Sequence, residues 1–276
     1  MEIFHSVIYG LIYGISEFFP ISPSAHQFLY CYLTGFSVTS SFLPLMCQLG
    51  CLFAVLFCCR SRLSHIRREL RLASLPKKRR KRMPDMQAVS DFRLVLTGLI
   101  PMIIGLLLQS KANAFFLSLP WIFLTLSVNC YFLYAGQFLY HEDRDSRNMN
   151  RLEGLLLGVC CGLSVIPGIS KIALLCYVCR QRRCSREYSL ELAFLFSIPM
   201  LLGSILVQII SIFSAGANLL STAAVAGGFL AALAAFGCAI VAIRLMRYFA
   251  VKMGFYGFSH YCFGLAIFSF LYYLMT

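Results

Sequence analysis

Charged residues are scarce in this chain of 276 residues, at 13%, which is about half of the roughly 25% typical of soluble domains. Several long stretches carry no charge, and the longest runs from 192 to 243. A helix that crosses a bilayer needs about 20 mostly apolar residues. The lack of charge therefore excludes a soluble protein. It predicts an all-α integral membrane protein in which residues 1–276 form a single membrane domain.

Two other signatures are missing. Most of the 13 cysteines lie in apolar runs, and Cys176-x-x-Cys179 has neither a second pair nor a histidine at the spacing of a zinc site. The N-terminus has no basic segment and no small-residue cleavage site, so we expect no cleavable signal peptide. The cysteines are therefore interpreted as small apolar residues.

Basic residues are abundant, and the net charge is +13. They gather in short segments between apolar stretches, most densely from Arg60 to Arg82. This distribution follows the positive-inside rule and suits anionic lipid headgroups, so nucleic acid is not the expected partner. The segment 60–90 is predicted to be a basic cytoplasmic loop.

Six apolar stretches are long enough for transmembrane helices: 42–59, 91–109, 115–140, 187–213, 219–243 and 255–275. Two others, 3–34 and 152–179, are interrupted by Pro20, Pro23 and Pro167. Their flanks are too short to cross a bilayer but suit re-entrant half-helices. We expect six transmembrane helices plus two re-entrant helical hairpins, whose breaks are buried in protein or line a wet cavity.

The two interrupted segments resemble each other. Residues 10–22 and 158–170 share glycines and serines at a constant offset, and three expected spans follow each segment. This pattern predicts an inverted 3+3 repeat, with repeat 1 at about 1–140 and repeat 2 at about 151–276. Counting crossings from the basic loop places both termini outside, and the two hairpin tips meet near the midplane.

Polar residues surround the first break. Glu17 lies in an apolar half-helix, where a charge costs about 2.5–3.5 kcal/mol and is a functional candidate; the alternative is an acid that reaches interfacial water. Ser22 and Ser24 follow, and Ser24 is expected to cap the next half-helix. His26 would lie on its first turn and can exchange protons near neutral pH, although a buried structural histidine is the alternative.

The second break provides the counterpart. Gly168 allows close backbone approach, Ser170 can cap a helix, and Lys171 is a cation in an apolar run; snorkelling of Lys171 toward the cytoplasm is its alternative. If the tips meet, Lys171 faces Glu17. Hydroxyls, a cation and two helix N-termini suit a phosphate group, because phosphoryl transfer depends on positioning and charge stabilisation. Glu191 is instead expected to pair with Arg186 or Arg180 at the membrane surface.

These motifs resemble those of the bacitracin-resistance type of undecaprenyl-diphosphate phosphatase. The similarity covers nearly the whole chain and is strongest at 14–26 and 167–171, with further matches at 48–50, 100–101 and 196–200. The resemblance implies a bacterial plasma-membrane enzyme that dephosphorylates undecaprenyl diphosphate and recycles the lipid carrier for cell-wall synthesis. The rival hypotheses are a polyprenyl-phosphate transporter or flippase, and a catalytically degenerate relative that only binds the lipid phosphate.

The chain departs from the family motifs at several positions. Tyr13 replaces a second acid, Pro23 replaces one of two serines, and Cys161 replaces a glutamine. Lys171 and Ile172 stand where the family has arginine and serine. Loss of a carboxylate weakens a divalent-metal site, and lysine lacks the bidentate geometry of arginine.

The resulting hypothesis assigns roles to seven residues. Glu17 holds a divalent cation (Mg²⁺ or Ca²⁺) or orients His26. His26 acts as general acid or base or as nucleophile, and Ser22 is the other candidate nucleophile. The diphosphate is bound by Ser24, Gly168, Ser170 and Lys171. A homodimer is left open.

Overall fold

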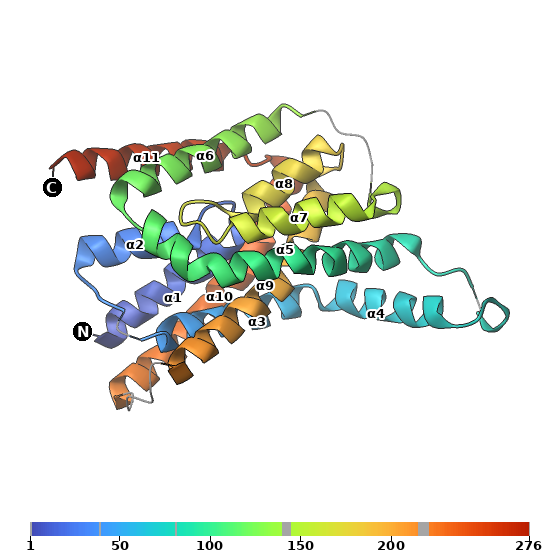
Figure 1. The fold of residues 1–276 in the computed structure, drawn as a ribbon, viewed down its shortest axis with the longest axis horizontal. Coiled ribbons are helices and arrows are strands. Elements are labelled where there is room, and N and C mark those ends of the chain that lie inside the picture. The colour runs from blue at the N-terminus through green and yellow to red at the C-terminus, as the bar shows by residue number, and fades with distance from the viewer. Residues whose placement is uncertain (1, 39, 81, 140–144, 215–220, 276) are drawn as a thin grey trace.

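The computed structural model describes residues 2–38, 40–80, 82–139, 145–214 and 221–275, and within them the regular structure is helical (Figure 1). The α-helices are α1 (Glu2–Phe18), α2 (Pro23–Thr34), α3 (Phe42–Cys58), α4 (Arg60–Ser74), α5 (Met86–Phe116), α6 (Leu119–Gln137), α7 (Arg151–Leu163), α8 (Lys171–Gln181), α9 (Arg186–Ser214), α10 (Thr222–Lys252) and α11 (Tyr256–Met275). Short 3₁₀ helices occupy Lys77–Arg79 and Ser146–Asn148.

Five of the described helices are long and apolar enough to cross a membrane: α5, α6, α9, α10 and α11. Helix α3 is long enough to cross a membrane only if it is counted together with α4, and the two helices are bent by 67° relative to each other. The protein is therefore a multi-pass membrane protein with five candidate spans, or six with the bent pair. Residues 140 and 219–220 of the expected spans lie outside the described residues.

The expected boundary between the second and third spans was wrong. Helix α5 continues to Phe116, beyond the expected end at 109, and α6 begins at Leu119. Pro120 lies in the first turn of α6, where its fixed φ and missing N–H are tolerated. The link between the two helices is therefore confined to Leu117 and Ser118.

The prediction of a loop over 60–90 was also wrong. Residues 60–74 form helix α4, and α5 already begins at Met86. Leu63, Ile66 and Leu70 recur at helical spacing and pack against the core, while the basic residues occupy the other faces. In Figure 1, α4 and the start of α5 extend together from the end of the bundle opposite to both termini.

A buried carboxylate on α4 holds the chain segment that precedes α5. Glu69 is fully buried and accepts hydrogen bonds from Arg82 Nη2 at 2.5 Å and from the backbone N–H of Asp85 at 3.0 Å. The hydrogen bond from Arg82, followed by that from Asp85, lowers the pKa of Glu69 to about 2. Protonation of Glu69 at acid pH should therefore weaken its contacts with Arg82 and Asp85.

We expect Glu69→Gln to lower the unfolding temperature at pH 7. The Glu69 carboxyl has a pKa of about 4.5 when unfolded and about 2 when folded, so its stabilisation is complete above pH 4.5 and lost as the pH falls toward 2. The difference between wild type and variant should shrink over that window in thermal unfolding measurements. Glu187→Gln, at an exposed position, serves as the control; a Glu69→Gln difference that does not change with pH would contradict the prediction.

Small residues bring helices from the two halves of the chain together. Helix α1 packs against α10, and α7 packs against α5. A Cβ at Gly14 would overlap the carbonyl of Ala235, and one at Gly158 would overlap the carbonyl of Gly98. Close approach of backbones is how membrane helices associate without a hydrophobic driving force. It places the breaks after α1 and α7 in the interior of the protein.

Candidate active site

At the first break, between α1 and α2, the N-cap of α2 is Ser22 rather than Ser24. The Ser22 side chain accepts a hydrogen bond from the N–H of Ala25 and is the N-cap of α2, with Pro23 at the first helical position. The expectation that Ser24 caps this helix was therefore wrong. Ser24 is free to turn its hydroxyl toward a cavity, while also lying 3.1 Å from Ser22 Oγ.

The second break, between α7 and α8, has the expected cap. The Ser170 side chain accepts from the N–H of Ala173. Gly168 has a φ of +99°, and a Cβ there would overlap Thr125 Oγ1, so the position requires glycine. Its N–H donates to Ser22 Oγ at 2.9 Å. The two breaks therefore touch, although they are far apart in sequence.

Asn129 joins the same two breaks, and no sequence motif pointed to it. This fully buried side chain on α6 accepts from the N–H of Ser170 at 2.9 Å and donates to the carbonyl of Pro20 at 3.1 Å. Its sequence signal is an amide in the middle of an apolar helix, where an unpaired polar group would be costly.

Glu17 and Lys171 form an ion pair where the breaks meet. Glu17 lies in the last turn of α1 and is 4% exposed, and Lys171 begins α8 and is 8% exposed. Lys171 Nζ donates to Glu17 Oε1. Two opposite charges held together in the protein interior are strongly coupled, because removal of either leaves the other buried without a partner.

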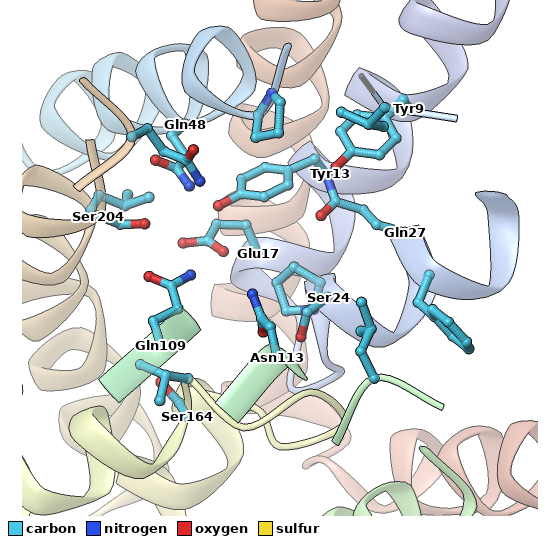
Figure 2. Close-up of a pocket in the computed structure, with 18 of the residues that line it drawn as sticks. Tyr9, Tyr13, Glu17, Ser24, Gln27, Gln48, Gln109, Asn113, Ser164 and Ser204 are labelled. Carbon is cyan, nitrogen blue, oxygen red and sulfur yellow. The ribbon is translucent and has the colours of Figure 1, made fainter. Parts of the chain in front are cut away.

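The ion pair lines a cavity of about 430 Å³. Figure 2 shows Glu17 among the polar residues that surround this cavity. Among its described lining residues, Glu17 and Lys171 are the charged ones, and most of the polar remainder are amides and hydroxyls. These polar residues are Tyr9, Tyr13, Ser24, Gln27, Ser37, Gln48, Gln109, Asn113, Ser164, Ser170, Ser204 and Gln208. Concave sites of this size with a few convergent polar groups are typical of ligand binding.

Three residues expected in the site lie outside the described lining of this cavity. Ser22 is fully buried, and Gly168 has its N–H bound to it. The imidazole of His26 lies between the carbonyl of Ser22, to which Nδ1–H donates at 2.6 Å, and the hydroxyl of Tyr261, 2.8 Å from Nε2. A carbonyl only accepts, so Nε2 of the neutral ring accepts from Tyr261. No described contact links His26 with Glu17.

A sequence profile described as "Bacitracin resistance protein BacA" matches residues 6–268. The chain belongs to this BacA family. Similar curated relatives include "Undecaprenyl-diphosphatase 1" of Shouchella clausii, at 30% identity over 99% of this chain and 97% of the relative. Proteins named "Undecaprenyl-diphosphatase" from Halothermothrix orenii and Alkaliphilus metalliredigens are 28% and 26% identical, each over 95% of both chains.

The positions predicted to depart from the family motifs differ in their relation to the cavity. Tyr13 and Pro23 line it, so the predicted loss of an acid at position 13 would change the cavity itself. Cys161 and Ile172 are fully buried and are not part of the described lining. Among the predicted departures, those at Tyr13 and Lys171 therefore place a hydroxyl and an ammonium group in the cavity lining.

Two amide oxygens in the cavity of this BacA family protein have no hydrogen-bond partner among the described residues. Gln48 is 4% exposed, and its Oε1 is buried without a hydrogen bond to the described part of the chain. The same holds for the buried Oε1 of Gln109. Figure 2 shows the Glu17 carboxylate between these two side chains. A buried polar atom without a partner needs an explanation such as a missing ligand or ion.

A second ionic cluster ties four helices at the opposite end of the bundle. Arg62 contacts Asp91 at 2.8 Å and Glu191 at 3.6 Å, and Arg247 contacts Glu191 at 2.6 Å. The expected partners of Glu191 were therefore wrong, because Arg180 instead donates to carbonyls at the end of α6. The cluster links α4, α5, α9 and α10 and supplies none of the cavity lining.

Proposed function

We propose that this protein hydrolyses undecaprenyl diphosphate to undecaprenyl phosphate and inorganic phosphate. The observation that carries the proposal is the buried Glu17–Lys171 ion pair in a polar cavity of a membrane protein. Family membership supports it, because the similar relatives are named for this activity. The bacterial plasma membrane is the proposed location.

Lys171 binds the diphosphate in this proposal. Its ammonium group leaves Glu17 for the incoming phosphate oxygens, which carry more charge than one carboxylate. The hydroxyls of Ser24 and Ser170 line the same cavity and can donate to the phosphate. The N–H groups of Gly168 and Ser170 hold the breaks together and are not assigned to the substrate.

The reaction adds water to the terminal phosphorus and breaks its bond to the bridging oxygen. The bridging oxygen stays with the lipid as a monophosphate, and the terminal group leaves as inorganic phosphate. Positioning and charge stabilisation dominate such a reaction, so Lys171 contributes by holding the negative charge that develops as the bond breaks. Ser22 and His26 are not required to contact the substrate in the observed arrangement.

The residues present fit a divalent cation. One carboxylate, two unpaired amide oxygens and hydroxyls form an all-oxygen donor set of the kind that Mg²⁺ and Ca²⁺ prefer. Glu17 would hold the ion, which would neutralise phosphate charge and polarise the phosphoryl group. The described residues contain no cluster of three or more histidine, cysteine or acidic side chains, so a soft-metal site is not proposed.

The inverted repeat is part of the same proposal. Helices α1 and α2 of repeat 1 would correspond to α7 and α8 of repeat 2. The packing of α1 against α10 in the other repeat would then correspond to the packing of α7 against α5. The interrupted segments would be re-entrant hairpins that dip from opposite faces. The basic end would face the cytoplasm, with both termini and the cavity toward the outside. Contact with anionic headgroups and a homodimer remain predictions.

Phosphate release from undecaprenyl diphosphate by the purified protein tests the function. We expect Glu17→Gln and Lys171→Met each to reduce the rate by roughly 10²–10³-fold, because each removes a preorganised charge. Glu187→Gln is the matched control. Equal rates in wild type and both site variants would end the assignment, and leaflet exchange without phosphate release would favour the transporter. A loss in His26→Gln as large as that in Glu17→Gln would require the imidazole to turn into the cavity.

A further inference from the structure

The cavity has too little positive charge for its proposed substrate. Glu17 and Lys171 neutralise each other, and the rest of the described lining is uncharged. A lipid diphosphate carries roughly two to three negative charges near neutral pH. Uncompensated charge is costly to remove from water. A cation that enters with the substrate would balance it.

The unpaired amides indicate where that cation would lie. The Oε1 atoms of Gln48 and Gln109 are buried and have no partner within the part of the chain that the structure describes. They belong to two helices, α3 and α5, on either side of Glu17 in Figure 2. A phosphate would repel these oxygens, whereas a hard cation binds carboxylate and amide oxygens together. Tyr13, which stands where the family has a second acid, lines the same space.

We propose that Gln48 and Gln109 complete a divalent-cation site with Glu17, so that one carboxylate and two neutral amide oxygens bind the ion. The inference rests on the proposed function and deepens it. Lys171 and the cation compete for Glu17: without substrate the lysine occupies the carboxylate, and the diphosphate draws the lysine away. The site therefore binds Mg²⁺ or Ca²⁺ weakly until the substrate arrives.

Cation binding can be measured without turnover. Tb³⁺ replaces Ca²⁺ at oxygen sites, and Tyr9 and Tyr13 in the cavity can sensitise its luminescence. In protein purified in an uncharged maltoside detergent, we expect a Tb³⁺ signal that Ca²⁺ displaces. Gln48→Leu and Gln109→Leu should each weaken Ca²⁺ binding roughly tenfold or more. Gln181→Leu, an exposed position on α8, makes the same chemical change away from the cavity and should have no effect.

Two variants are expected to bind more tightly, which a damaged fold would not do. Gln48→Glu adds a carboxylate, and Lys171→Met removes the competitor of the cation, so each should strengthen Ca²⁺ binding roughly tenfold. Weaker or unchanged binding in Gln48→Glu would overturn the site and would mean that the amide donates to phosphate. A Lys171→Met protein without a Ca²⁺-displaceable signal would also overturn it, because this variant lacks the lysine that competes with the cation for Glu17.

Phosphate release measured in parallel keeps the two proposals separate. Hydrolysis that persists with a chelator, together with absent Tb³⁺ binding, would remove the cation site and leave the phosphatase assignment intact. Cation binding that follows the expected order of variants, without phosphate release from wild type, would keep the site and remove the phosphatase assignment.

Discussion

Neutralising either member of the central ion pair is expected to destabilise the protein more than neutralising both. Glu17→Gln or Lys171→Met leaves one buried charge without a partner, and the expected loss is about 3–5 kcal/mol in the free energy of unfolding. The double variant removes both charges and should recover stability to within about 1 kcal/mol of wild type. Denaturant or thermal unfolding in detergent measures these differences.

Activity should not follow stability in this double-mutant cycle. The double variant lacks both the phosphate-binding ammonium and the carboxylate. Its rate of phosphate release should therefore be no higher than that of the less active single variant. Additive stability effects of the two substitutions would show that Glu17 and Lys171 are not coupled, and would remove the geometry on which the proposed function depends.

Gly168→Ala is expected to disrupt the junction of the two breaks. Its φ of +99° strains any residue with a Cβ, and the added methyl would overlap Thr125 Oγ1. We expect a loss of about 2–4 kcal/mol in unfolding free energy. Phosphate release should fall as well, because Gly168 positions the start of α8 and therefore Lys171.

Gly237→Ala is the matched control for this substitution. A Cβ there meets nothing within 4 Å, and the residue lies inside α10, so alanine should be neutral or stabilise by up to about 1 kcal/mol. Similar unfolding temperatures for Gly168→Ala and Gly237→Ala would contradict the close contact between the breaks.

The sequence predicted the interruptions well because proline acts locally. The breaks fall where Pro20, Pro23 and Pro167 indicated, and the meeting of Glu17 with Lys171 followed from the expectation that interrupted segments are buried. The capping residue of α2 was also predictable in principle. Pro23 favours the first helical position, which makes Ser22 the N-cap.

Other features depend on contacts between distant segments. Gln48, Gln109 and Asn129 are amides in apolar helices, and their immediate sequence neighbours do not show that they face the protein interior. His26 was assigned to the site because it is close in sequence to Glu17, but the helical turn at α2 directs it toward Tyr261. Helix α4 had an apolar periodicity in Leu63, Ile66 and Leu70 that the surrounding basic residues obscured.

The ionic cluster of Arg62, Asp91, Glu191 and Arg247 bears on the route by which the lipid carrier enters and leaves the cavity. It fastens four helices, and its four residues are not part of the described cavity lining. We therefore expect a headgroup that enters from the other end of the bundle to leave by the same route. The dephosphorylated carrier should then be released into the leaflet from which it came.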